Sequence, residues 1–204
     1  MLVLASSSPR RRELLALAGF AFTVSPALIA EELRAGESPI GYVTRLAREK
    51  AEAVWSRHSA QDREDDARMV LGADTTVVAA DGQILEKPLD EAHAARMLRL
   101  LSGTTHQVIT GVALVSSAGV EVAAEVTYVT MLTLSDAEIA EYLAAGESMD
   151  KAGAYAIQGR AARWVPRIHG CYFNVMGLPL ALVSSMIEGV RVRSELGQRT
   201  AASI

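Results

Sequence analysis

The sequence contains few of the features that mark secreted, membrane-spanning or nucleic-acid-binding proteins. It has one cysteine, Cys171, so no disulfide can form within the chain, which suits a reducing compartment. No apolar run reaches the roughly 18 residues of a transmembrane helix, and the N-terminus does not have the pattern of a secretory signal. A formal net charge of −4 argues against general nucleic-acid binding. We therefore expect a cytoplasmic protein with no nucleic-acid or membrane partner.

Several common catalytic motifs are missing as well. The chain has no Walker-type phosphate loop, no Gly-x-Gly-x-x-Gly turn and no Gly-x-Ser-x-Gly elbow. Its four histidines do not have the spacing of zinc ligands. A serine nucleophile would lack a named base, so covalent serine chemistry is not favoured.

Aromatic residues make up only 5% of the chain, whereas 50% of its residues are hydrophobic. Apolar runs typical of strands and amphipathic segments typical of helices follow each other without strict alternation. We predict an α/β fold with a mixed twisted sheet, flanking helices and a cleft at the strand ends. The expected strands are 2–5, 20–24, 69–80, 84–88, 107–115, 120–134 and 162–168, and the expected helices are 9–18, 39–57, 90–101, 135–145 and 179–189. The charged stretch 58–68 reads as a loop of unknown role, and the tail 191–204 is expected to be frayed.

The N-terminus is where the chain first indicates a function. An apolar run over residues 2–5 is followed by three serines, a proline and the three arginines of residues 10–12. Ser8 suits a helix N-cap, and Pro9 suits the first helical position. The free N–H groups of a helix start attract anions, and guanidinium groups bind phosphate oxygens in pairs. This turn predicts phosphate binding, although a plain helix cap with surface arginines is the alternative.

Charged residues inside apolar patterns are the next candidates. Asp74 interrupts a run typical of a buried strand, where a carboxylate is costly unless it is paired, hydrogen-bonded or metal-bound. Lys50 falls within the apolar stripe of a predicted helix, although a lysine can also extend outward from the edge of such a stripe. Lys87 could equally be a plain surface lysine. Glu31 and Glu32 are ordinary solvated acids unless a triphosphate lies near them, in which case they could hold Mg²⁺.

A series of ordered segments resembles the Maf family of nucleotide pyrophosphatases. The matching segments are Ala5–Leu15, Arg45–Ala51, Leu71–Thr75, Glu86–Pro88, Leu101–Val108, Asp150–Gly159 and Gly177–Leu180. The resemblance covers about residues 2–188. It implies a single domain over residues 1–190, with two lobes around a deep cleft as in the inosine triphosphate pyrophosphatases.

The resemblance also implies an activity. Members of this family hydrolyse a nucleoside triphosphate to the monophosphate and pyrophosphate with a divalent cation, here Mg²⁺ or Mn²⁺. The positions that match catalytic residues are Asp74, the proton acceptor, with Lys50 and Lys87. The positions that match phosphate-binding residues are Ser6, Arg10 and Arg11. The metal ligands we expect are Asp74 and Glu31.

The base specificity can be predicted in the same way. The residues that match the specificity determinants of the dTTP/UTP branch are Arg11, Thr75 and Gln158. The Gln158 carboxamide offers a donor and an acceptor, which suits the O4 and N3–H edge of uracil or thymine. Hydrolysis of 7-methyl-GTP or of modified nucleotides remains an alternative, as does a nucleotide-binding regulator of cell division and septum formation without turnover. A homodimer would be typical of the family.

Overall fold

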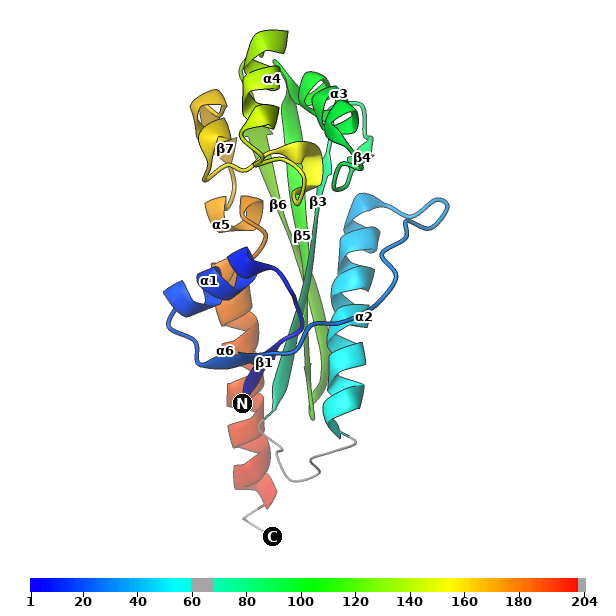
Figure 1. Cartoon of the computed structure of the whole chain (residues 1–204). Helices are drawn as coiled ribbons and strands as arrows, with labels where there is room; N and C mark the ends of the chain where they lie inside the picture. The colour runs from blue at the N-terminus through cyan, green and yellow to red at the C-terminus, as the bar shows by residue number, and fades with distance from the viewer. Residues whose placement is uncertain (60–67, 202–204) are drawn as a thin grey trace. The chain divides into compact units, whose positions relative to one another are not determined.

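The computed structural model describes residues 1–59 and 68–201 (Figure 1). The helices are α1 (Pro9–Leu17), α2 (Pro39–Ser59), α3 (Glu91–Leu101), α4 (Asp136–Ala144), α5 (Tyr172–Val175) and α6 (Leu180–Ala201), with the 3-10 turns η1 (Ala152–Ala154) and η2 (Arg160–Trp164). The strands are β1 (Leu2–Leu4), β2 (Phe22–Val24), β3 (Met69–Val78), β4 (Ile84–Leu85), β5 (Thr105–Ser116), β6 (Gly119–Thr130) and β7 (Arg167–His169). Of the predicted loop 58–68, residues 60–67 lie outside the described residues.

The strands form one mixed sheet. Within the described residues its order is β2-β1-β3-β5-β6-β7, and β4 pairs with β3. Strand β1 lies parallel to β2 and β3, whereas the β3–β4 and β6–β7 pairs are antiparallel. The predicted mixed sheet with flanking helices is therefore confirmed.

The chain divides into two compact units, and each has its own core. Unit 1 contains Met1–Asp74, Gly111–Ala124 and Gly177–Ile204, and unit 2 contains Thr75–Thr110 and Glu125–Met176. In unit 1, small and β-branched side chains of α2 pack against those of the strands β1, β3 and β5. The buried members of this core are Val3, Ala5, Ala47, Ala51, Val54, Val70, Ala113 and Val115. Figure 1 shows α2 and α6 of this unit on either side of its strands. The expected cleft between two lobes stays a prediction.

Two glycines bring α2 unusually close to the sheet of unit 1. A Cβ atom on Gly72 of β3 would collide with the backbone oxygen of Ala47, and one on Gly111 of β5 would collide with the backbone of Val43. Glycine is the residue that permits such an approach between a helix and a strand. The contact matters for function because Lys50 follows Ala47 by one helical turn.

Helix α6 is longer than the sequence predicted. A helix over 179–189 and a frayed tail from residue 191 were expected, but α6 runs from Leu180 to Ala201. The apolar spacing continues through Ile187 to the buried Val190, and the residues beyond it include good helix formers. Each of the two glycines, Gly189 and Gly197, costs a helix only about 1 kcal/mol, and neither ends this one. The helix thus extends beyond the predicted end at residue 189, and the frayed tail stays a prediction.

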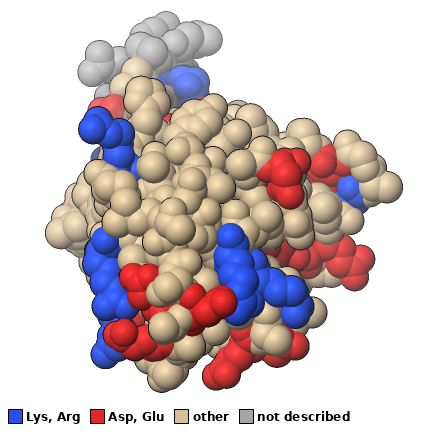
Figure 2. Space-filling view, turned by 90° about the horizontal axis from the view of Figure 1, so that it is seen from above, with Lys and Arg blue, Asp and Glu red and all other residues tan. Residues whose placement is uncertain are grey.

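The surface carries both signs of charge. On the face shown in Figure 2, acidic and basic side chains are interspersed, and neither sign covers that face. None of the helices in the described part of the chain has the length and the apolar character needed to cross a membrane.

Candidate active site

The N-terminal turn is built as the sequence predicts. Ser8 has an extended backbone and caps α1, because its Oγ accepts a hydrogen bond from the Arg11 N–H at 3.5 Å, and Pro9 is the first helical residue. The buried Ser6 supports the same turn: its Oγ accepts from the Ser8 N–H at 3.2 Å and from Arg11 Nη1 at 3.2 Å. The turn is thus held by hydroxyl groups, with the first N–H groups of α1 at its open end.

Arg11 connects this turn to two other segments of unit 1. Its Nη1 donates to the Ala73 carbonyl at 2.8 Å, and its Nε donates to the Gly177 carbonyl at 2.9 Å. Burial lowers the pKa of the Arg11 guanidinium, and the nearby carboxylates of Asp74 and Glu31 oppose this shift. An arginine remains a cation under such conditions. Arg11 therefore places a fixed positive charge beside the two carboxylates.

Lys50 joins those two carboxylates directly. Its Nζ lies 2.6 Å from Asp74 Oδ1 and 2.6 Å from Glu31 Oε1. The Lys50 and Asp74 side chains are only 8% and 10% exposed, so this lysine does not extend outward from the helix edge. Of the predicted acidic pair, it is Glu31 that reaches the lysine. The alternative of a snorkelling lysine is thereby excluded, whereas Glu31 pairs with Lys50 and still has a side chain that is 43% exposed.

The environment of Asp74 makes it a stronger base than an ordinary aspartate. Burial raises the pKa of the Asp74 carboxyl, and the Glu31 carboxylate adds to this effect, whereas Lys50 and Arg11 oppose it. The net direction is upward, because desolvation of the charged form outweighs the attraction of the two cations. A raised pKa brings a carboxylate closer to the range in which general bases work.

The carboxylates also fit a divalent cation. Across residues 1–59 and 68–201, no group of three or more His, Cys, Asp or Glu side chains could hold a metal ion. Asp74 and Glu31 nevertheless converge on one point, since both touch the same ammonium group. Mg²⁺ typically takes one or two protein carboxylates and completes its shell with water and substrate phosphates. Two convergent carboxylates therefore suit Mg²⁺ bound together with a phosphate ligand.

In unit 2, Thr75 belongs to a chain of hydrogen bonds that determines whether its hydroxyl donates or accepts. Its Oγ1 lies 2.9 Å from Thr110 Oγ1, and Thr110 Oγ1 donates to the Asn174 carbonyl at 3.1 Å. A hydroxyl has one hydrogen, so Thr110 must accept from Thr75. Thr75 then presents acceptor lone pairs to any other partner. Sequence reasoning missed Thr110 and Asn174; the only signal for Asn174 was a polar residue in an apolar segment.

The remaining predicted residues are less constrained. Arg10 is partly buried beside Arg11, and the pKa of Arg11 is lowered slightly further by its charge. Lys87 and Gln158 are exposed residues of unit 2. Their roles stay predictions.

The fold and the site together define a mixed α/β protein in which a lysine joins two carboxylates and an arginine of helix α1 lies near both of them. The chain belongs to the Maf family: the family model described as "Maf-like protein" matches residues 1–190. The family membership predicted from the motifs is confirmed.

Curated relatives share about half of their residues with this chain. A protein of Koribacter versatilis (strain Ellin345) named dTTP/UTP pyrophosphatase is 53% identical over 186 residues, covering 91% of this chain and 92% of the relative. A protein of the same name from Salmonella typhimurium (strain LT2) is 54% identical over 179 residues, covering 88% and 87%. The structure of the Staphylococcus aureus Ham1 protein is 12% identical with a TM-score of 0.36, covering 64% of this chain and 71% of that one. That likeness is too weak to carry an argument.

Proposed function

We propose that this protein hydrolyses nucleoside triphosphates, with dTTP and UTP preferred, to the nucleoside monophosphate and pyrophosphate. The observation that carries the proposal is the Lys50 ammonium between Asp74 and Glu31, with the Arg11 guanidinium beside them. Such a cluster combines a base with fixed positive charge, which is what phosphoryl chemistry requires. The names of the curated relatives support the same reaction and the same substrates.

The N-terminal turn would hold the triphosphate. Arg10 and Arg11 would pair with phosphate oxygens, and the first N–H groups of α1 would face them. Ser6 already accepts two N–H bonds, so its hydroxyl hydrogen is the group it would offer to a phosphate oxygen. The carbonyl contacts of Arg11 keep its guanidinium in place before the substrate arrives, so little ordering is needed on binding.

Asp74 would be the proton acceptor. A water molecule would attack the α-phosphorus, its proton would pass to the Asp74 carboxylate, and the bond from the α-phosphorus to the bridging oxygen would break, so that pyrophosphate leaves. Lys50 would orient Asp74 through their 2.6 Å contact. Lys50 and Lys87 would offset the charge that develops on the phosphate oxygens.

A divalent cation, Mg²⁺ or Mn²⁺, is the proposed cofactor, and Asp74 and Glu31 are the residues that would hold it. When bound, such an ion would neutralise phosphate charge and make a coordinated water more acidic. Lys50 joins the same two carboxylates, so a bound cation would share Asp74 and Glu31 with the lysine ammonium.

Arg11, Thr75 and Gln158 are the proposed specificity residues. An acceptor on Thr75 suits an imide N–H such as N3–H of uracil or thymine, and the Gln158 carboxamide suits the neighbouring carbonyl and N–H groups. We further propose that residues 1–190 act as one functional domain, because the family model runs through both units without a break. A cytoplasmic location and a homodimer stay predictions.

The test is pyrophosphate release from dTTP, UTP, CTP and 7-methyl-GTP, with Mg²⁺, with Mn²⁺ and with a chelator. We expect turnover of dTTP and UTP to exceed that of the other two and to need the cation. D74N should lose about 10²–10⁴-fold in kcat, the usual contribution of a general base, and should retain nucleotide binding by calorimetry. D136N, which changes an exposed aspartate paired with Arg99, is the matched control and should keep the wild-type rate.

Three outcomes would contradict parts of the proposal. Full activity of D74N would remove Asp74 from the mechanism. Tight binding of dTTP without pyrophosphate release would favour a nucleotide-binding regulator. Faster hydrolysis of 7-methyl-GTP than of dTTP would place the protein in the other specificity branch.

A further inference from the structure

Of the four charged residues Arg11, Glu31, Lys50 and Asp74, Glu31 is the one that lies in a loop. It sits in the loop between β2 and α2, where residues 25–38 form neither helix nor strand. Its side chain is 43% exposed, and an ion pair that exposed contributes little on its own. Something other than the pair with Lys50 must therefore fix the loop.

Arg45 of α2 makes four hydrogen bonds, three to the loop and one within α2. Its Nε and Nη2 donate to the two Glu37 carboxylate oxygens at 2.6 and 2.7 Å, and Nη2 also donates to the Glu32 carbonyl at 2.9 Å. Its Nη1 donates to Glu49 Oε2, one helical turn further along α2, at 3.2 Å. The two-pronged bond to Glu37 lowers the pKa of that carboxyl to about 2, so the pair stays charged at any working pH.

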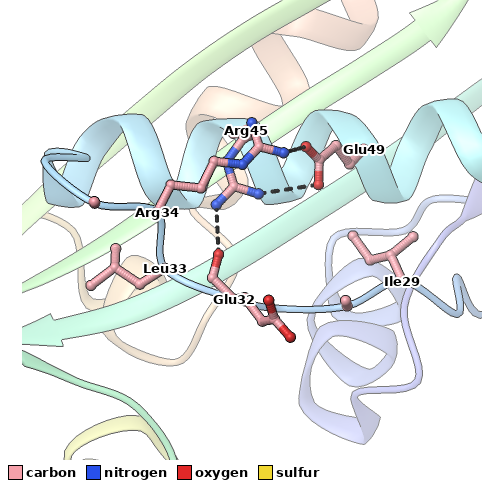
Figure 3. Close-up of a pocket in the computed structure, with 8 residues that line it drawn as sticks. Ile29, Glu32, Leu33, Arg34, Arg45 and Glu49 are labelled. Carbon is pink, nitrogen blue, oxygen red and sulfur yellow. Dashed lines mark hydrogen bonds and ion pairs between the residues drawn. The ribbon is translucent and has the colours of Figure 1, made fainter.

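Tyr42, one turn earlier on α2, acts on the neighbouring peptide group. Its Oη donates to the Glu31 carbonyl at 3.4 Å, and the Arg45 guanidinium lies over the Tyr42 ring, 5.7 Å from its centroid. The carbonyls of Glu31 and Glu32 are thus both fastened to the same face of α2. Figure 3 shows the Arg34 and Arg45 side chains between this loop and Glu49, around an open pocket of about 660 Å³.

We propose that Arg45 is a positioning residue that holds Glu31 against Lys50, and that it does so by binding the Glu32 carbonyl and the Glu37 carboxylate. The inference rests on the proposed function, because it assigns Glu31 a role in that reaction. Helix α2 carries both Arg45 and Lys50. The position of the loop relative to the lysine is therefore set by one rigid helix. A lysine at position 45 could not replace this arrangement, since only the guanidinium fork reaches three acceptors of the loop at once.

The experiment compares R45M with R48M, which removes an arginine three residues further along α2. Arg48 makes a single exposed pair with Glu52 at 2.7 Å, so R48M controls for the loss of a helix arginine. Trypsin cleavage after the exposed Arg34, followed by mass spectrometry, reports on the loop without any need for activity. We expect R45M to be cleaved at least about fivefold faster than wild type and R48M to be cleaved at the wild-type rate.

The kinetic part uses E31Q and the double variant E31Q/R45M with dTTP and Mg²⁺. Changes in residues that support metal ligands typically cost 10–100-fold, so R45M should lose about that much in kcat. Its KM for dTTP should change by less than about twofold, whereas the Mg²⁺ concentration for half-maximal activity should rise. The double variant should be no slower than E31Q alone, because both changes remove the same function. R45K, which keeps the charge but loses the fork, should fall between wild type and R45M.

Several results would overturn the inference. One is that the kcat losses of E31Q and R45M multiply in the double variant. A second is that R45M and R45K are cleaved after Arg34 at the wild-type rate. A third is that R48M is as defective as R45M. If R45M does not fold by circular dichroism, R45K alone decides the question. If the wild type releases no pyrophosphate from any nucleotide, the proposed function fails, and the cleavage rates still decide whether Arg45 holds the loop.

Discussion

Replacing Lys50 by methionine should destabilise the protein by an amount that grows with pH. K50M keeps the apolar stem but leaves the Asp74 carboxylate, 10% exposed, without its closest counter-charge. The folded protein can limit the loss by protonating Asp74, whose ordinary pKa is 3.8. The cost of that protonation is therefore a ceiling on the loss: about 4.4 kcal/mol at pH 7 and about 1.6 kcal/mol at pH 5. Arg11 remains nearby, so we expect about 3 kcal/mol at pH 7.

The direction in which the stability of K50M changes with pH follows from the direction of the Asp74 pKa shift. Without Lys50 the pKa of Asp74 rises further, so the folded state holds a proton that the unfolded state releases above pH 3.8. Stability is then retained at low pH and lost as the pH rises through the folded-state pKa. Urea unfolding of wild type and K50M at pH 5 and pH 7 measures the difference. The double variant K50M/D74N should recover most of the loss at pH 7.

R99M is the control for this prediction. Arg99 and Asp136 form an ion pair of similar length, 2.7 Å, but their side chains are 53% and 79% exposed. Removing an exposed pair typically costs about 0–1 kcal/mol, with little dependence on pH in this range. If K50M were as stable as wild type at both pH values, the burial and pairing of Lys50 with Asp74 would be refuted.

Two further predictions concern pH. The acid limb of the pH profile of kcat/KM for dTTP should lie above the pH range in which an ordinary aspartate titrates. The reason is that burial raises the pKa of Asp74 and activity needs its ionised form. An acid limb near pH 4 would count against Asp74 as the base. Burial also lowers the pKa of His106 to about 4, so the unfolded chain takes up a proton below pH 6.5 that the folded chain does not. The free energy of unfolding, measured with urea, should fall by up to about 3 kcal/mol between pH 6.5 and pH 4 because of His106. H106Q should lack this decrease. If H106Q had the pH dependence of the wild type, the prediction would be wrong.

Some parts of the site could be predicted because their signals are local. Ser8 and Pro9 specify a helix start within a few residues, and the structure has that cap. Asp74 and Lys50 stood out as charges within apolar patterns, and a buried charge needs a partner. What the pattern could not supply was the identity of the partner. Lys50 and Asp74 form an ion pair with each other because α2 lies close to β3.

Other parts depend on contacts between distant segments and have no local signal. The local pattern does not distinguish Glu31 from Glu32, and only the family resemblance favoured Glu31. In the structure, Tyr42 binds the Glu31 carbonyl and Arg45 binds the Glu32 carbonyl. Thr110 acquires its role only because the Asn174 carbonyl lies within 3.1 Å of its hydroxyl. Arg45 was part of a recognised motif, but nothing in its neighbours along the chain indicates that its partners lie in the loop before α2.

The close approach of α2 to the sheet explains why these distant contacts act together. At Gly72 and Gly111 no strand side chain separates helix α2 from β3 and β5, so at these two points the helix lies directly against the strand backbone. Tyr42, Arg45 and Lys50 all project from that helix, and the first two determine where Glu31 lies while the third pairs with it and with Asp74. The distance between the two carboxylates is thus set by the depth at which one helix sits on β3. The small residues at the helix–sheet contact therefore support the proposed catalytic arrangement together with its charged groups.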